Sequence, residues 1–148
     1  MSAEPSDIDY SKFTQSLLRL EEQHHHLAHD TDELPEWVVD SIKESVIQRF
    51  ETCYDSCWKL VRRYLIQNIR LPDVPNGPNP VLRLAAENFL LGGELSDWMT
   101  YSKARNDTSH DYSKEKADAC LAIVDAFIPA AVKLHENLTG QSWTSAQP

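Results

Sequence analysis

The sequence predicts an all-α fold, an antiparallel (up-and-down) bundle of four to five helices. Three observations indicate it. Apolar residues recur at steps of three and four over several long segments, which is the spacing of one helix face. No stretch alternates apolar and polar residues as a half-buried strand would. The connections between the periodic segments are short, so successive helices should run antiparallel.

The first half of the chain should form a helical hairpin. Residues 1–8 are expected to be a disordered acidic tail, and the periodic segment 9–28 predicts the first helix. An acidic turn before Pro35 should end that helix and begin another. The pattern from residue 35 to 68 then predicts a single helix of about 50 Å, the longest of the bundle. Its periodic positions are Val39, Ile42, Val46, Phe50, Cys53, Cys57, Val61 and Tyr64.

A proline-rich connection separates this hairpin from the rest of the domain. Residues 71–80 contain four prolines, so we expect the main loop of the protein there. Asn79 and Pro80 should open a short helix that runs to about residue 91 and ends at Gly92 and Gly93.

Two further helices complete a domain that we place at residues 9–140. Ser96 should cap the first of them. Ser113 should cap the second, which runs to about residue 137 and carries Pro129 as an expected kink or local irregularity. Residues 141–148 should be a frayed tail.

The charge of the chain limits how it could bind nucleic acid. Fourteen Lys and Arg against 23 Asp and Glu give a net charge of −9, which does not favour a broad basic surface. A local basic patch remains possible, because Lys59, Arg62, Arg63 and Arg70 lie in a twelve-residue run without an acidic residue. Lys59, Arg62 and Arg63 are the candidates for RNA binding, and the alternative is a solvated cationic helix face.

Apolar runs and cysteines indicate the compartment. No apolar run approaches 18 residues, and the polar first 30 residues contain no apolar segment of a secretory signal, so we expect neither a membrane span nor export. The cysteines are Cys53, Cys57 and Cys120. The odd number of cysteines and the helical spacing of Cys53 and Cys57 favour reduced thiols in the core over a metal or redox role. Reduced thiols in turn indicate a cytoplasmic protein.

A histidine cluster at the end of the first helix invites a metal-site interpretation. His25 and His29 are spaced i,i+4 next to His24 and His26. No cysteine or pair of carboxylates stands nearby as a further ligand, so we favour a polar helix end. We therefore expect the protein to use no metal and no cofactor.

Residues 105–112 concentrate the chemistry of the chain. Arg105 can hold a phosphate with its planar fork of donors. His110 can give or take a proton near neutral pH. Tyr112 offers a hydroxyl that could bind a ligand or be modified. Without further support, His110 could equally be a structural cap, and Arg105 could pair with Asp107 or Asp111.

Two segments resemble a known family. Phe50-Glu51-Thr52-Cys53-Tyr54-Asp55-Ser56-Cys57-Trp58-Lys59 resembles the F-E-x-x-x-E-x-x-W-K segment of HepT-like HEPN proteins, once labelled nucleotidyltransferase substrate-binding proteins. Asp55 stands where that family usually has Glu. The Arg105-Asn106-x-x-x-His110-x-Tyr112 segment is similar to the family's R-x4-H-x-Y signature, and the similarity extends over residues 42–134.

The resemblance implies a HEPN-type bundle that forms a homodimer and acts as a toxin of a type VII toxin–antitoxin pair. Such toxins are metal-independent endoribonucleases whose Arg and His, here Arg105 and His110, cleave RNA such as transfer RNA. It also implies a cognate minimal nucleotidyltransferase, which neutralises the toxin by transferring AMP to the signature tyrosine, here Tyr112.

The residues can be tested against that chemistry. RNA supplies its own nucleophile, the 2′-OH, so a general base, a general acid and a positive charge on the phosphate suffice. Arg105 and His110 lie about 140° apart on an ideal helix, so we expect the helix to end or distort between them. Asn106 and its three successors are poor helix-interior residues, which favours such a break.

One histidine per chain is few for both proton transfers, and a two-fold dimer would join two Arg–His pairs. Glu51 and Asp55 could support the site by ordering Lys59 or Arg105, or they could be merely solvated. The alternative function is a non-catalytic subunit that presents a substrate, or itself, to a nucleotidyltransferase.

Overall fold

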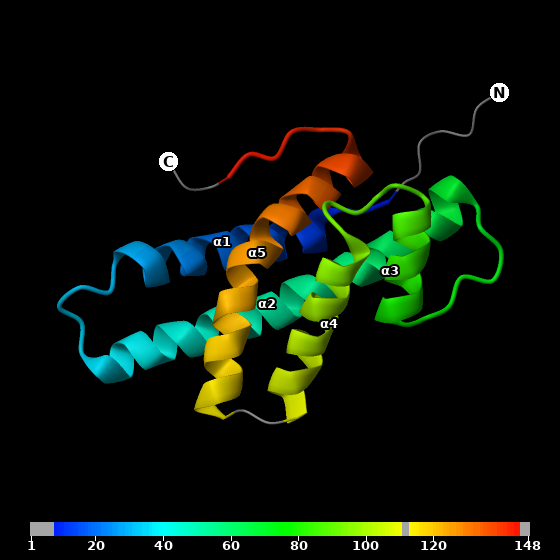
Figure 1. The fold of residues 1–148 in the computed structure, drawn as a ribbon. Helices are drawn as coiled ribbons and strands as arrows, with labels where there is room; N and C mark the ends of the chain where they lie inside the picture. Colours follow the sequence, from blue (N-terminus) through cyan, green and yellow to red (C-terminus); the bar gives the residue numbers. More distant parts are fainter. Residues whose placement is uncertain (1–7, 111–112, 146–148) are drawn as a thin grey trace.

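The computed structural model describes residues 8–110 and 113–145, of which 109 and 110 are described by their backbone alone. Within these ranges the chain contains five α-helices and no strand, as the sequence predicts. Figure 1 shows α1 (Ser11–His29) and α2 (Glu36–Tyr64) side by side, with α5 (Lys114–Thr139) crossing them. The helices α3 (Pro78–Glu87) and α4 (Leu95–His110) lie on the other side of α2 from α1.

The long helix changes its winding at its end. The α-helical part of α2 ends at Tyr64, and a single π turn, Leu65–Ile69, carries the chain to Arg70. Arg70 adopts a left-handed conformation (φ 64°), and the N–H of Leu71 donates to the carbonyl of Leu65 at 3.0 Å. The predicted helix over 35–68 is therefore helical from Glu36 onward, with Pro35 as its N-cap, and its last turn is wider than an α-helix.

The helix α3 ends earlier than expected. It stops at Glu87 because the Asn88 side chain donates to the carbonyl of Leu84 at 2.8 Å and Phe89 takes a positive φ of 59°. Gly92, expected as the helix end, has another role. A Cβ placed on it would lie 2.5 Å from Cβ of Lys133, so the close approach of this segment to α5 requires glycine.

The core contains a cluster of aromatic rings from three helices. Phe127 of α5 has ring-centroid distances of 5.0 Å to Phe50 of α2 and of 5.4 and 5.8 Å to Tyr101 and Trp98 of α4. Trp98 also donates its indole N–H to the carbonyl of Gly92 at 2.9 Å. This packing fixes α4 against α2 and α5, and α4 carries the candidate site. The three cysteines are buried as predicted.

The ends of α5 are well defined. The Ser113 side chain accepts a hydrogen bond from the N–H of Lys116, so the predicted cap is confirmed. The helix continues past Pro129 to Thr139. Beyond it, Trp143 contacts the ring of His135 (centroids 4.7 Å apart) and donates its indole N–H to Glu21. This part of the expected frayed tail is therefore held against the bundle. None of the described helices is long and apolar enough to cross a bilayer.

Candidate functional site

The side chain of Arg105 connects α4 to α2. Its Nε and Nη2 donate to Oδ1 and Oδ2 of Asp55 at 3.2 and 3.0 Å, a bidentate pair. Its Nη1 donates to Oε2 of Glu51 at 3.2 Å. Glu51 and Asp55 lie one turn apart on α2, so they meet the guanidinium from two directions. Glu51 and Asp55 therefore order Arg105. The sequence allows two partners for these carboxylates, Lys59 and Arg105.

The electrostatics of this cluster favour a fixed, charged Arg105. The hydrogen bond to Asp55 is the main reason that the pKa of Arg105 is raised above its ordinary value, and the charges of Asp55 and Glu51 add to it. The Arg105 side chain is one-quarter exposed, so part of it is accessible to solvent. Beneath it, burial raises the pKa of Tyr54 to about 12, which keeps that phenol neutral.

Thr108 joins the same cluster. Its hydroxyl lies 2.8 Å from Oε2 of Glu51 and 3.2 Å from the carbonyls of Ala104 and Arg105. Thr108 is a buried polar residue, 5% exposed. The sequence-based site missed it, although it lies inside the signature segment, because a threonine there has no distinctive spacing to a charged partner.

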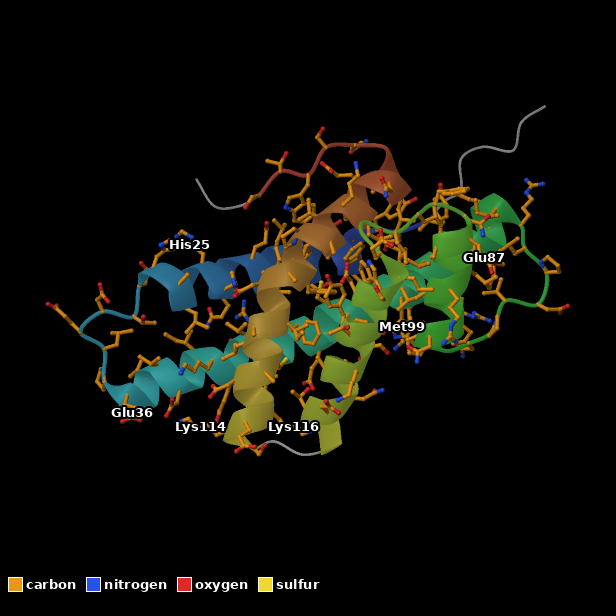
Figure 2. The ribbon with its side chains drawn as sticks, in the orientation of Figure 1. His25, Glu36, Glu87, Met99, Lys114 and Lys116 are labelled. Carbon is orange, nitrogen blue, oxygen red and sulfur yellow. The ribbon has the colours of Figure 1, made fainter. Side chains whose placement is uncertain are left out.

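The predicted break between Arg105 and His110 is wrong. The helix α4 runs without interruption from Leu95 to His110. The residues expected to interrupt it are stabilised by side-chain bonds: Thr108 binds carbonyls of its own helix, and Asp107 accepts from Lys103, one turn earlier, at 2.7 Å. Asp107 also forms an ion pair with Lys116 of α5 at 3.6 Å, and Figure 2 shows Lys116 beside the end of α4. Asp107 is thus not the partner of Arg105.

The remaining signature positions are described less fully. Asn106 is exposed on α4. The side chain of His110, and both Asp111 and Tyr112, lie outside the described residues. Their predicted roles therefore stay predictions.

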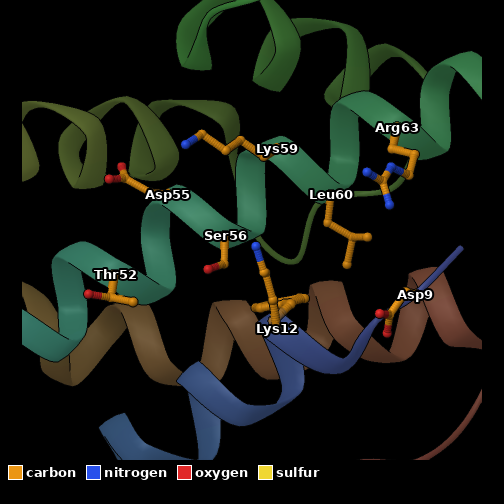
Figure 3. A pocket seen from close by; sticks show the side chains of 9 residues that line it. Asp9, Lys12, Thr52, Asp55, Ser56, Lys59, Leu60 and Arg63 are labelled. Atoms are coloured by element: carbon orange, nitrogen blue, oxygen red, sulfur yellow. The ribbon is translucent and has the colours of Figure 1, made fainter.

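The three candidates for RNA binding differ from one another. Arg62 donates to the carbonyls of Pro75 and Val74 at 3.0 and 3.3 Å, so it holds the proline-rich loop against α2. Lys59 and Arg63 are exposed. Both line a pocket between α1 and α2, together with Asp55 and with Lys12 of α1 (Figure 3). The sequence analysis did not select Lys12, a single lysine at the start of an amphipathic helix.

The histidines of α1 make individual contacts. His24 pairs with Asp125 at 2.6 Å and His26 with Asp30 at 2.7 Å. The rings of His25 and His29 lie 4.5 Å apart, centroid to centroid. Over residues 8–110 and 113–145, no three His, Cys, Asp or Glu side chains are placed to hold a metal ion together.

The chain is similar to proteins of one family. The family model "Nucleotidyltransferase substrate binding protein like" matches residues 8–140. "Probable ribonuclease HepT" of Haemophilus influenzae is 38% identical over 109 residues, which is 72% of this chain and 74% of that protein.

Two solved structures share the fold. One is a Haemophilus influenzae protein whose fold is described as that of a substrate binding domain of a nucleotidyltransferase. It has a TM-score of 0.79 and 31% identity, over 88% of this chain and 98% of the other. The second, from Thermus thermophilus, has a TM-score of 0.70 and 25% identity, over 86% and 98% of the two chains. The chain therefore belongs to the nucleotidyltransferase substrate binding protein-like family.

Proposed function

We propose that this protein is a metal-independent endoribonuclease, the toxin of a type VII toxin–antitoxin pair, acting in the cytoplasm. The observation that carries the proposal is Arg105, a guanidinium held on α4 by Asp55 and Glu51 with part of its surface in solvent. It stands five residues before His110 in the signature segment. The similarity to a protein named "Probable ribonuclease HepT" supports the same activity.

The proposed reaction uses the 2′-OH of RNA as nucleophile. A general base removes its proton while its oxygen attacks the adjacent phosphorus, and a general acid protonates the departing 5′-oxygen. The products are a 2′,3′-cyclic phosphate and a 5′-hydroxyl, so no water is consumed in this step. His110 would transfer the proton, and Arg105 would bind the phosphate oxygens, whose negative charge increases in the transition state.

The charges around Arg105 limit what it can do alone. A guanidinium has five N–H donors, and three are used by Asp55 and Glu51, which leaves two for a phosphate. One cation with two carboxylates has a formal charge of −1, so the cluster does not attract an anion by itself. Additional positive charge must come from elsewhere on the chain or from a second copy.

A two-fold homodimer would bring two Arg105–His110 pairs together. It would also let the Arg105 of one copy act with the His110 of the other, since the two positions are about 140° apart around a regular helix. In this proposal Glu51 and Asp55 are positioning residues, and Asn106, exposed beside Arg105, supports substrate binding. Sedimentation of the purified protein at micromolar concentration should therefore show a dimer, and a monomer would contradict the composite site.

The proposed partner is a minimal nucleotidyltransferase that transfers AMP to Tyr112. The family model and the description of the similar Haemophilus influenzae structure both refer to a nucleotidyltransferase, which supports such a partner. The same descriptions favour the second candidate function, a non-catalytic subunit that binds substrate for that enzyme.

One assay separates the two functions. Purified protein without partner is incubated with transfer RNA in EDTA, and the products are tested for cyclic phosphate ends. The ribonuclease proposal expects cleavage that an Arg105→Ala variant of equal helicity lacks. Intact RNA after prolonged incubation of the folded dimer would favour the binding subunit.

A further inference from the structure

A second polar feature lies on α2, next to the Arg105 cluster. The pocket between α1 and α2 has a volume of about 410 Å³, within the range of small-ligand sites. Figure 3 shows Lys12 reaching toward α2 from α1, Arg63 near one end of the pocket, and Lys59 extending along α2 toward Asp55. The hydroxyls of Thr52 and Ser56 lie on the same α2 face, so cations and hydrogen-bond donors from two helices border one pocket.

The charge of this pocket contrasts with that of the chain, which has a net charge of −9. Among the residues that the structure describes, Lys12, Lys59 and Arg63 form no salt bridge. Two carboxylates line the pocket. That of Asp55 is paired with Arg105, and that of Asp9 accepts a hydrogen bond from the backbone N–H of Ser11 at 2.9 Å. Three cations against these two carboxylates leave the pocket with an excess of one positive charge.

Asp55 connects the pocket to the candidate site. Its side chain lines the pocket and binds Arg105, so the two features are adjacent. From Thr52 to Arg63 the α2 face extends over about 16 Å at 1.5 Å per residue. A polynucleotide bound at Arg105 and following this face would pass Lys59 first, one turn beyond Asp55, and Arg63 one turn later. These cations supply the positive charge that the Arg105 cluster lacks.

The lining also indicates which part of a nucleotide would bind. Phe13 and Leu60 contribute the apolar part of the pocket, and both are buried in the core, 1% and 7% exposed. A buried ring has no free face on which a base could stack. Ammonium, guanidinium and hydroxyl donors are instead the groups that proteins use on phosphates, without sequence selectivity.

We propose that the pocket formed by Lys12, Ser56, Lys59 and Arg63 binds a backbone phosphate of the RNA strand, one or a few nucleotides from the cleaved bond. The inference rests on the proposed ribonuclease function and adds to it a phosphate subsite, in which α1 takes part through Lys12. The subsite binds the strand and orders it, and it does not act on the reacting atoms.

The test measures binding without cleavage. The probe is a fluorescent single-stranded oligonucleotide with 2′-O-methyl groups throughout, which keeps the phosphates and removes the nucleophile. Its affinity for the full-length protein is measured by anisotropy at several salt concentrations, for wild type and for Lys12→Gln/Arg63→Gln. The matched control is Arg19→Gln/Arg83→Gln, which removes two exposed cations from α1 and α3 and gives the same net charge.

Each phosphate contact contributes about 0.7 to the slope of log affinity against log salt for a single strand. The pocket variant should therefore bind more weakly, with a slope shallower by about 0.7 for the loss of one phosphate contact, while the control keeps the wild-type slope. Equal slopes in the pocket variant and wild type would overturn the proposal, as would an equal loss in the control or no binding by wild type.

A parallel assay keeps the two hypotheses distinct. Wild type is also incubated with unmodified RNA in EDTA. If it does not cleave but the slope difference is present, the ribonuclease function is wrong and the phosphate site remains. If it cleaves and the slopes are equal, the reverse holds.

Discussion

Arg105 of α4 and Asp55 of α2 are joined by two parallel hydrogen bonds of 3.2 and 3.0 Å, fifty residues apart in the chain. The pair fixes the plane of the guanidinium, because a bidentate carboxylate permits only one orientation of the fork. Glu51 binds the third nitrogen from the side. The two carboxylates thus neutralise the positive charge of Arg105. They also fix the direction of its two remaining N–H donors.

We expect a measurable coupling between Arg105 and Asp55. The Arg105 side chain is 25% exposed and that of Asp55 is 36% exposed, so solvent screens the pair in part. A double-mutant cycle with Arg105→Gln and Asp55→Asn should give a coupling of about 1 kcal/mol in the free energy of unfolding, at the upper end for exposed pairs. Denaturant unfolding of the four proteins measures it.

The pair between Lys103 and Asp107 provides the control. It also bridges side chains at 2.7 Å, but its lysine is 73% exposed and its geometry is not bidentate. The corresponding cycle should give a clearly smaller coupling, because solvent screens this exposed i,i+4 pair more strongly. Equal coupling in the two cycles would mean that the Arg105 cluster has no special rigidity.

Stability should depend on pH through His135. Burial lowers the pKa of this imidazole below its ordinary value of 6.5, with Glu136 opposing the shift. The neutral form is therefore the one that the fold favours, and Thr14 shares a 2.8 Å hydrogen bond with its Nε2. The free energy of unfolding should fall as the pH decreases below about 6.5, because the unfolded chain then binds a proton that the folded one resists.

The measurement compares unfolding curves between pH 5 and 7.5 for wild type and His135→Gln. The variant should show a weaker pH dependence in this window, and His29→Gln, which changes an exposed histidine of α1, should keep the wild-type profile. Parallel profiles of wild type and His135→Gln would show that another group controls the acid response.

Periodicity was sufficient to predict most of the architecture. The apolar stripes place α1, α2 and α5, because tertiary burial requires one face of each of these helices to be apolar, whereas residues typical of helix ends indicate α3 and α4. Helix propensity gave a wrong prediction at residues 106–109, where it indicated a break in the helix. There Asp107 and Thr108 are stabilised by contacts with Lys103 and Glu51. Such contacts depend on which elements meet in space, and a single helix pattern does not contain that information.

The site was predictable in part for the same reason. The spacing of Glu51 and Asp55 placed both carboxylates on one face of α2, but only the packing of α4 selects Arg105 over Lys59 as their partner. Lys12 could not be selected, since nothing in α1 indicates that its first turn faces residues 52–63. The contact of Trp143 could not be predicted either, because its partner Glu21 is more than a hundred residues away in the chain.

The catalytic roles predict a specific pattern of losses. His110→Ala and Arg105→Ala should each reduce RNA cleavage by on the order of 10²-fold or more, as expected when a proton-transfer group or the charge that binds the phosphate is removed. Both variants should also lose growth toxicity when expressed without the partner. Single-turnover cleavage of transfer RNA in EDTA provides the rate, and circular dichroism confirms that the helices persist.

Arg105→Lys separates charge from geometry. It keeps the cation but cannot bind Asp55 in a bidentate way, so cleavage should remain well below wild type. Full toxicity of a folded His110→Ala variant would falsify the ribonuclease function.

Tyr112 is proposed as the residue through which the partner controls the toxin. It follows His110 by two residues and directly precedes the Ser113 cap of α5, so a group attached to it stays close to the signature segment. AMP on its hydroxyl would bring an anion to a cluster that already contains Glu51 and Asp55, and the two free donors of Arg105 could bind that phosphate in place of RNA. Inhibition then requires no change of fold.

Tyr112→Phe keeps the ring and removes the acceptor oxygen, so it should remain toxic when the nucleotidyltransferase is co-expressed. With ATP as donor and pyrophosphate as the leaving group, intact-mass measurement should show an AMP addition on wild type and none on the variant. Tyr101→Phe is the matched control, since that hydroxyl lies 3.4 Å from a main-chain carbonyl of α5, on a residue only 5% exposed, and should not be a substrate. An undiminished mass gain on Tyr112→Phe would show that another residue accepts AMP. It would also contradict the proposed competition between AMP and RNA for Arg105.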